Sequence, residues 1–480
     1  MILDSNSASG GYDIDNSLKL EADNSENLYR NLNASTSTTK FTHSMWVKRT
    51  ELVNAQLLYM RGVAGNEATL LRFSGESGYE HGLQIDIGGS STNARSVTTR
   101  KFRDTSAWYH FVLAVDTTQS TAANRRRLYV NGVEETVFGM NNTPSQNFAM
   151  EVSSAKHRYG AYNDTENYAP FSGYIAECHY IDGSQLDATS FGEFDDDSGI
   201  WKPKQYTGSY GTGGYYLDFS DSSDLGANAQ GDDVNFTLRN IAAADQATDT
   251  PTNNFNIFFA NHLFNESGGD NALPREGNTV INHDYATGWA TAFTTISVSK
   301  GKWYAEFEAT NISSKPNVIF GVINTDTTAD ETDNYIGSSS GWGVGIYMDT
   351  KDVFINNGAS VSATGNTISN GDIIGVALDM DNNFAYFSIN NQWITNTGDA
   401  FGGDPTSGST GTGGYAIQDA DHMFAVSVYN PSSTYSCNFG GHTKISLSSA
   451  ASDANGYGNF EYAPPSGYYA LCTKNLAEYG

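Results

Sequence analysis

Two hydrophobic segments in opposite halves of the chain follow the same plan. Residues 108–116 (WYHFVLAVD) lead to LYVNG at 128–132, and residues 371–381 (GDIIGVALDMD) lead to FSIN at 387–390. In each, two apolar runs rich in β-formers flank a polar turn, which indicates a strand, a turn and a second strand that ends at Asn. The repeated plan predicts two β-sandwich domains in tandem.

Other segments show the alternation of half-buried strands. Between residues 41 and 48, Phe41, Met45 and Val47 share one face with His43, and polar residues and Trp46 occupy the other. Apolar side chains at every second position predict a strand with one face in a core. Further short strands follow at close intervals, separated by turn residues, and only residues 186–191 favour a short helical turn. The predicted fold class is all-β, with antiparallel sandwiches.

The length of the chain also requires more than one core. Single cores stop growing near about 250–300 residues, and the chain has 480. Residues 220–255 contain few large apolar side chains and look like a loop. We therefore predict one domain over residues 1–250, which ends in a linker, and a second over residues 251–480.

The charge is strongly acidic and uneven. The chain carries a net charge of −28; residues 206–480 hold 8 basic against 29 acidic side chains, and residues 1–205 hold 18 against 25. Such a surface repels phosphate backbones, so we expect no nucleic-acid partner. No apolar run reaches the roughly 20 residues of a membrane span, so we expect no membrane insertion either.

The three cysteines and the N-terminus bear on the compartment. Cys178, Cys437 and Cys472 are an odd number without a CxxC pair, which predicts neither a disulfide framework nor a zinc site. The start of the chain lacks a basic segment followed by an apolar one, so we expect no secretory signal and synthesis in a reducing cytosol.

Candidate catalytic motifs are incomplete. Residues 337–341 match GxSxG, but the following residues favour a strand where a nucleophile elbow needs a helix. Glycoside hydrolysis needs two carboxylates across the bond that is cleaved. The nearest pairs, Glu306 with Glu308 and Glu193 with Asp195, have no third carboxylate at the expected spacing. The prediction is a protein without enzymatic activity and without catalytic residues.

Metal and cofactor sites are not specified by the sequence. Residues 379–390 begin like a calcium loop, but Phe384 and Asn390 stand where Gly and Glu are required, which favours a hairpin turn. Residues 195–199 could gather oxygen ligands, so the metal ligands stay unknown and structural calcium stays an open alternative; no other cofactor is expected. We expect His43 and His179 to pack within strands, and residues 125–127 (RRR) to form a solvated turn, with docking to an acidic partner as the alternative.

One loop is a candidate for carbohydrate contact. Exposed aromatic faces stack on sugars while amides and carboxylates bind hydroxyls. Five residues combine these types in one segment: Tyr159, Tyr162, Asn163, Asp164 and Tyr168. The alternative is that these tyrosines only fill a sandwich, in which tyrosine is common.

The two halves resemble different sandwich families. The first half resembles laminin-G-like, concanavalin-A-like domains in four anchors: WYH at 108–110, Asp116, LYVNG at 128–132 and FSGYIAE at 171–177. The second half resembles SPRY domains in five: GKWYAE at 301–306, IFGV at 319–322, GWG at 341–343, GDIIGVALD at 371–379, and Phe387 with Asn390. The resemblance implies two tandem jelly-roll sandwiches.

Seven short phrases are spread along nearly the whole chain: GYDIDNSL at 11–18, VDTTQ at 115–119, YIDG at 180–183, YTGSYG at 206–211, YYLDF at 215–219, DTPTN at 249–253 and PPSGYYALCT at 464–473. Together and in this order they resemble virion proteins of marine tailed bacteriophages. The resemblance implies a lectin-like structural protein on the virion surface, assembled in the host cytoplasm. It also implies a tail-fibre or spike component that binds a host surface glycan or receptor.

The resemblance to virion proteins also implies partners for the protein, and two alternative functions stay open. The partners are other virion proteins and the host glycan or receptor. A homo-oligomer is expected because particle appendages follow the symmetry of their mounting site, and a trimer is the usual state of a fibre. A capsid decoration or head-fibre protein is one alternative function, and a glycan-degrading enzyme is a second.

Overall fold

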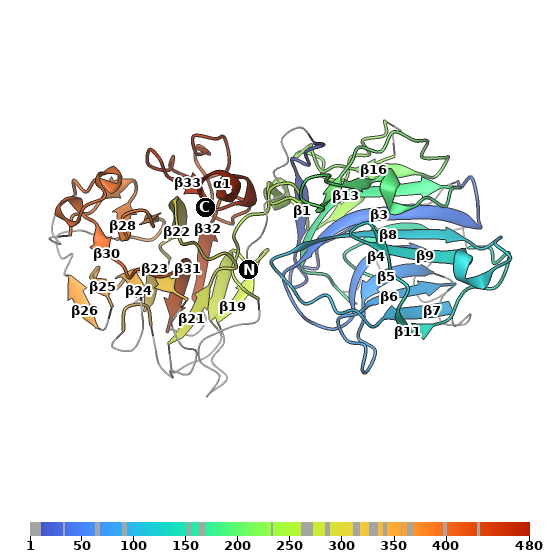
Figure 1. Cartoon of the computed structure of the whole chain (residues 1–480), viewed down its shortest axis with the longest axis horizontal. Helices are drawn as coiled ribbons and strands as arrows, with labels where there is room; N and C mark the ends of the chain where they lie inside the picture. Colours follow the sequence, from blue (N-terminus) through green and yellow to red (C-terminus); the bar gives the residue numbers. More distant parts are fainter. Residues whose placement is uncertain are drawn as a thin grey trace. The chain divides into compact units, whose positions relative to one another are not determined.

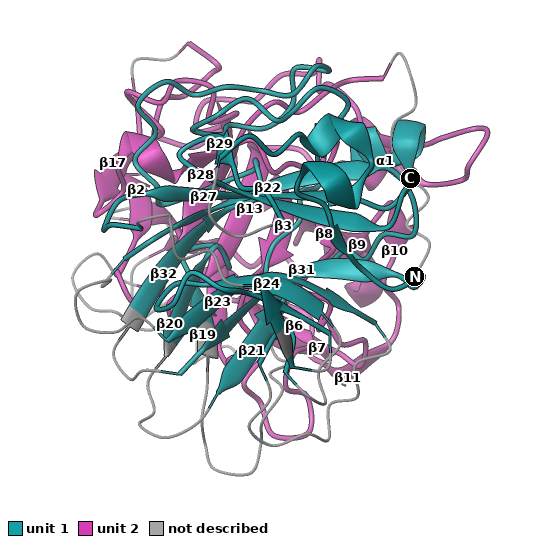
Figure 2. Ribbon diagram, turned by 90° about the vertical axis from the view of Figure 1, so that its left-hand side faces the viewer, with its two compact units in different colours: residues 1–5, 254–480 teal, residues 6–253 magenta. Residues whose placement is uncertain are grey.

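The computed structural model divides the chain after Asn253 into two compact units, each described by itself here. They are the N-terminal unit, residues 6–253, and the C-terminal unit, residues 254–480 (Figure 2). The residues described are 11–31, 34–62, 68–88, 94–150, 155–162, 169–231, 234–260, 272–283, 289–310, 317–325, 335–338, 343–356, 358–361, 368–396, 401–429 and 433–480.

The N-terminal unit consists of two eight-stranded antiparallel sheets and a small hairpin (Figure 1). The first sheet has the order β10-β9-β8-β3-β13-β1-β18, with β16 paired to β13, and the second has the order β11-β7-β6-β5-β4-β12-β2-β17. The elements are β1 (Ser17–Leu20), β2 (Asn27–Asn31), β3 (Lys40–Arg49), β4 (Gln56–Gly62), β5 (Thr69–Phe73), β6 (Leu83–Ile87), β7 (Ala94–Thr98), β8 (Trp108–Asp116), η1 (Ala122–Arg125), β9 (Arg126–Val130), β10 (Val133–Glu134), β11 (Phe138–Asn141), β12 (Lys156–Tyr159), β13 (Gly173–Asp182), η2 (Ala188–Ser190), β14 (Gly192–Phe194), β15 (Trp201–Pro203), β16 (Tyr215–Leu217), β17 (Thr237–Arg239), η3 (Ala243–Asp245) and β18 (Gln246–Ala247).

Both faces of β3 are buried, which differs from the expectation of one buried face. Phe41, Met45 and Val47 lie in the main core between the sheets. Trp46, on the opposite face, lies in a second apolar cluster with Phe191 and Trp201, supplied by a later part of the chain. A third layer therefore covers the first sheet. The predicted helical turn at 186–191 belongs to this layer as η2, with Asp187 accepting a hydrogen bond from the Thr189 amide.

The sequence predicted a loop at 220–255 that ends the first domain as a linker, but up to Asn253 this segment is part of the compact N-terminal unit. Leu225 and Phe236 pack into its main core. Asp249 is fully buried and binds the Lys48 ammonium at 2.6 Å. The largest apolar side chains of the segment are buried or half-buried, and Asp245 and Asp249 pair with the buried Lys19 and Lys48. The linker prediction was therefore wrong.

The C-terminal unit repeats the sandwich plan with a nine-stranded sheet, β19-β20-β32-β22-β27-β28-β29 with β30 and β33 at its sides, and a six-stranded sheet, β21-β31-β23-β24-β25-β26. Its elements are β19 (Ala272–Arg275), β20 (Val280–His283), β21 (Ala290–Phe293), β22 (Lys302–Glu308), β23 (Val318–Asn324), β24 (Gly343–Tyr347), β25 (Val353–Ile355), β26 (Ala359–Val361), β27 (Ile373–Asp379), β28 (Phe384–Ile389), β29 (Gln392–Trp393), η5 (Pro405–Ser407), η6 (Thr410–Thr412), β30 (Tyr415–Ala416), β31 (His422–Val428), β32 (Ser433–Asn438), β33 (Tyr469–Ala470) and α1 (Thr473–Tyr479). The all-β fold class is confirmed.

The two similar segments form the same turn in both units. Between β9 and β10, Asn131 and Gly132 have φ of 47° and 79°, and between β28 and β29, Asn390 and Asn391 have φ of 48° and 63°. Positive φ at both central residues is the type I′ geometry that Asn and Gly favour. The first Asn of each turn accepts a hydrogen bond from a backbone amide of an earlier strand or turn, at 2.7 Å for Asn131 and 2.9 Å for Asn390.

Within the described part of the chain, no helix has both the length and the apolar character needed to cross a membrane. The three cysteines are free thiols buried in the two units.

Candidate functional site

A cluster of polar aromatic side chains surrounds one carboxylate on the outer face of the first sheet. We call it the Glu177 cluster. Its residues come from the N-terminal segment, from β13 and from the chain around β16: Tyr12, Glu177, His179, Tyr206, Tyr210 and Tyr216.

The cluster exists because of a bulge in β13. The pairing of β13 with β3 shifts between Ala176 and His179, and Glu177 has a φ of +49°. A bulge puts two successive residues on one face of a strand. Here Ala176 and Glu177 both face outward, while Cys178 returns to the main core. Positive φ is strained for a residue other than Gly, and such strain gathers at functional sites.

The Glu177 carboxylate is held by three neighbours. It accepts hydrogen bonds from the hydroxyls of Tyr12 (3.1 Å) and Tyr216, and His179 Nε2 lies 3.3 Å from it. The other ring nitrogen of His179 lies 2.9 Å from the Tyr210 hydroxyl. The His179 ring stacks on Tyr216 with 4.4 Å between centroids, so the imidazole is fixed on both edges and one face.

The tyrosines of the cluster act as hydrogen-bond donors. Burial, and secondly the charge of Glu177, raises the pKa of Tyr12, Tyr210 and Tyr216 far above the usual value. Their hydroxyls stay protonated at any physiological pH. The carboxylate itself is 5% exposed, but Tyr12, Tyr206 and Tyr216 are half-buried. The cluster therefore offers partly open aromatic surfaces above a fixed acceptor, which suits a polar ligand with an apolar face.

The predicted tyrosine loop is only partly as expected. Tyr159 was expected to be exposed, but it lies in β12 and is 0% exposed. Its hydroxyl is 2.8 Å from His43 Nε2 and 2.9 Å from the Tyr215 hydroxyl, because the alternation of β12 turns it into the core. That part of the prediction was wrong. Tyr162 is half-buried against the apolar cluster around Leu57, and Asn163, Asp164 and Tyr168 lie outside the described residues.

Neither predicted carboxylate pair has the arrangement of a hydrolase. Glu306 is 0% exposed and accepts from the Tyr304 hydroxyl, Asn438 and the amides of residues 461 and 462, so substrate has no access to it. Asp195 accepts from the Ser198 amide within its own turn and from Lys202 on β15, and these bonds lower its pKa to about 2. Both carboxylates serve local structure.

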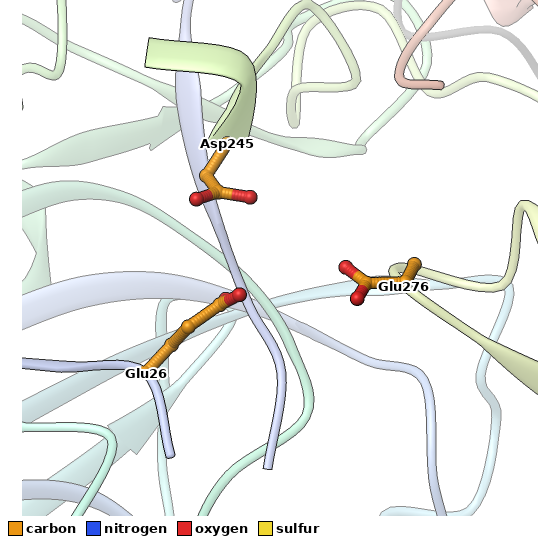
Figure 3. Close-up of side chains that lie close together, drawn as sticks. All are labelled: Glu26, Asp245 and Glu276. Carbon is orange, nitrogen blue, oxygen red and sulfur yellow. The ribbon is translucent and has the colours of Figure 1, made fainter. Parts of the chain in front are cut away.

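Three carboxylates that could serve as metal ligands, those of Asp379, Glu26 and Asp245, are bound to lysine ammonium groups instead. Asp379 binds Lys302 Nζ at 2.9 Å, and the predicted hairpin turn follows it between β27 and β28. Glu26 and Asp245 approach each other from η3 and the start of β2 (Figure 3). The Lys19 ammonium, at 3.0 Å from Glu26 and 2.8 Å from Asp245, neutralises them. The ammonium takes the role that a metal ion would have there.

Other sequence-based expectations concern basic residues. His43 and His179 are buried within strands, as predicted. The basic triplet at 125–127 is more structural than expected: Arg125 donates to the carbonyls of Gln119, Ser120 and Pro144, and Arg126 is buried against the Phe138 ring at 4.2 Å.

Ser338, in the GxSxG segment, is buried; residues 339–341 are not described.

The Glu177 cluster was not predicted from the sequence. Glu177 closed one anchor of the laminin-G-like resemblance, and Tyr206, Tyr210 and Tyr216 lay in phrases that resemble those of virion proteins, but nothing in the sequence joined them. The usable signals were the unusual density of tyrosine in residues 206–216 and an earlier strand with two ionisable residues, Glu177 and His179.

Comparison with known proteins supports the fold of the N-terminal unit. Residues 22–186 match the family described as the concanavalin A-like lectin/glucanases superfamily, of laminin-G type. The match covers about a third of the chain and agrees with the antiparallel sandwich found there. The match includes β2 to β13, and with them Glu177 and His179, but not the tyrosines at 206–216. A search among curated proteins found no match.

Similar solved structures include a human HERC1 SPRY domain, a pentraxin and a domain of an arabinanase. The SPRY domain is 15% identical, with 38% of this chain and 96% of that chain covered and a TM-score of 0.27. The heptameric SAP-like pentraxin from Limulus polyphemus is 13% identical, with 37% and 80% covered and a TM-score of 0.28. Domain 4 of AbnA, a GH43 extracellular arabinanase from Geobacillus stearothermophilus in complex with arabinotriose, is 22% identical, with 33% and 66% covered and a TM-score of 0.24. No residue role is transferred from these.

Proposed function

We propose that the chain is a non-enzymatic, carbohydrate-binding structural protein of a bacteriophage particle, in a tail fibre or spike that attaches to a host surface glycan or receptor. The observation that carries the binding role is the Glu177 cluster: half-buried tyrosine rings around a fixed carboxylate, on a sandwich whose family is named for lectins and glucanases. The resemblance of nearly the whole chain to virion proteins supports the location.

Binding fits the cluster better than hydrolysis does. Hydrolysis of a glycosidic bond needs an acid and a second carboxylate placed about 5–10 Å apart. Glu177 is the one carboxylate that accepts hydrogen bonds within the cluster, and three neighbours already occupy it. A carboxylate so engaged orients tyrosine hydroxyls, and these can exchange hydrogen bonds with sugar hydroxyls while the rings cover the apolar face of the sugar.

The test is a glycan array probed with the full chain and with two tyrosine variants. Tyr206 is half-buried, stacks on Phe191 at 5.1 Å and donates only to the nearby Ser209 carbonyl, so Tyr206→Ala removes a ring without breaking the Glu177 network. We expect affinity for the glycan bound by the wild type to fall about tenfold, the equivalent of about 1.4 kcal/mol. Tyr79→Ala, which removes a half-buried tyrosine outside the cluster, should bind as the wild type does.

Two results would oppose this function. Equal loss in both variants, or none in either, would remove the Glu177 cluster from glycan binding. Release of reducing sugars from the bound polysaccharide would make the protein an enzyme. The location is tested by immunogold labelling of phage particles and by the copy number per particle, since a head decoration would label the capsid and be present in many more copies than a tail appendage.

A further inference from the structure

The core of the N-terminal unit contains a guanidinium without a hydrogen-bond partner among the described residues. Arg61, on β4, is 1% exposed, and none of its three side-chain nitrogens bonds to a residue that the structure describes. Arg49, equally buried on β3, differs: it donates to Gln56 and to the carbonyls of Phe102 and Val53. A buried cation is stable only when it is paired or hydrogen-bonded. Arg61 therefore needs a partner beyond these side chains.

The neighbours of Arg61 are also basic. β12 lies between β2 and β4, and His157 stands directly opposite both Arg30 and Arg61. Side chains opposite each other on neighbouring strands share a face, so these three form a row of basic groups inside the sandwich. From the facing sheet, the Tyr180 ring lies 4.5 Å from that of His157 and 5.4 Å from that of Phe41, and the Arg61 guanidinium is 6.0 Å from Phe41.

These neighbours present donors without acceptors. Burial, and then the charges of Arg61 and Arg30, lowers the pKa of His157, so its ring carries a single proton. The Tyr59 hydroxyl lies 2.9 Å from Nδ1, and with Tyr59 as the donor the neutral ring carries its proton on Nε2. Among the described residues, neither His157 Nε2 nor the Tyr180 hydroxyl has a hydrogen-bond partner. Arg61, His157 and Tyr180 thus share a need for an acceptor.

Asp182 is a carboxylate whose charge acts on Tyr180, and it is already engaged. Asp182, which follows Tyr180 on β13, accepts hydrogen bonds from Ser35 Oγ at 2.8 Å, from the Gly213 amide at 3.0 Å and from the Thr36 amide. The ionisable groups that lower the pKa of His157, besides burial, are Arg61, Arg30, His43 and Arg158, all of them basic. From this set of donors we propose that Arg61, His157 and Tyr180 bind a small monovalent anion, such as chloride, between the two sheets of the N-terminal unit.

The first test compares thermal unfolding of the full chain in sodium chloride and in sodium gluconate at equal ionic strength. An anion bound only by the folded state raises the midpoint of the N-terminal unit, and we expect about 3 °C in chloride over gluconate. Arg61→Met should lose this difference and, in gluconate, be no less stable than the wild type, since it removes an unpaired charge. Arg49→Met, which breaks a paired guanidinium, should be less stable in both salts and keep the difference.

Identical midpoints in the two salts, or a chloride effect that survives Arg61→Met, would overturn the proposal. A second measurement does not depend on any variant folding: crystals of the wild type grown in sodium bromide should show an anomalous peak beside the Arg61 guanidinium and His157 Nε2. Density there without an anomalous signal would identify water as the acceptor, and would also overturn the proposal.

Discussion

At the scale of single residues, Glu177 has a strained backbone conformation and a carboxylate that accepts hydrogen bonds from its neighbours. Replacement by Ala removes the acceptor of two tyrosine hydroxyls, which should cost about 2 kcal/mol, and leaves the strain of positive φ in place. Replacement by Gly loses the same acceptor but relieves about 1 kcal/mol of strain. We therefore expect Glu177→Gly to be more stable than Glu177→Ala in urea unfolding. The reverse order would show that the bulge is unstrained.

Glu306 is the residue with the clearest pH dependence. Burial is the main reason that its pKa is raised from 4.5 to about 7, in spite of the hydrogen bonds that it accepts. A raised folded-state pKa means that its contribution to stability is fully present below pH 4.5 and is lost as the pH rises through 7, by at most about 3 kcal/mol.

The Glu306 contribution can be measured by comparing how steeply the free energy of unfolding changes with pH in the wild type and in a variant. The free energy of unfolding of the C-terminal unit should fall between pH 4.5 and 7.5 in the wild type, and this component should be missing in Glu306→Gln. Parallel pH profiles of the two proteins would contradict the raised pKa. The comparison uses slopes because Gln presents an amide group to backbone amides at 461 and 462, which lowers stability at every pH.

At the scale of elements, the segment that precedes the C-terminal unit is held by a buried ion pair. Asp249 binds Lys48 Nζ at 2.6 Å and accepts from the Trp108 indole at 3.0 Å. Asp249→Ala leaves the Lys48 ammonium buried and unneutralised by this partner, which should cost about 3–5 kcal/mol. The pair Lys48→Met/Asp249→Leu should recover most of that loss.

The control for this ion pair is a similar pair at the surface. Lys40 lies 3.3 Å from Asp116, but its side chain is 38% exposed. Lys40→Ala should therefore change the free energy of unfolding by less than about 1 kcal/mol. Equal effects of Asp249→Ala and Lys40→Ala in urea unfolding would mean that residues 246–253 detach easily from the first sheet.

Contacts between residues close together in the chain could be predicted from the sequence, but contacts between residues far apart in the chain could not. Asn131 and Asn390 identified their hairpins because turn chemistry depends on adjacent residues. The second burial of β3 was missed because Trp46 is covered by residues more than a hundred positions later. The Glu177 cluster was missed for the same reason: its hydrogen bonds join residues separated by 165 and 39 positions. Periodicity reports which face of a strand is apolar, but not what later covers the other face.

At the scale of the whole molecule, each unit has its own core and its own pair of sheets. The main cluster around Met45 contains only residues of the N-terminal unit, and that around Phe320 only residues of the C-terminal unit. Units with separate cores fold independently in most proteins. The Glu177 cluster and the basic row at Arg61 both lie wholly within residues 11–253.

The last prediction therefore concerns the two units expressed separately. A fragment of residues 1–253 should fold cooperatively, bind the same glycans as the full chain and keep the stabilisation by chloride, because it contains all residues of both sites. A fragment of residues 254–480 should fold but bind none of those glycans. Circular dichroism, array binding and thermal unfolding measure these outcomes. If the first fragment folds but loses glycan binding while the second retains it, the carbohydrate site belongs to the C-terminal sandwich, and the Glu177 cluster is a structural support of β13.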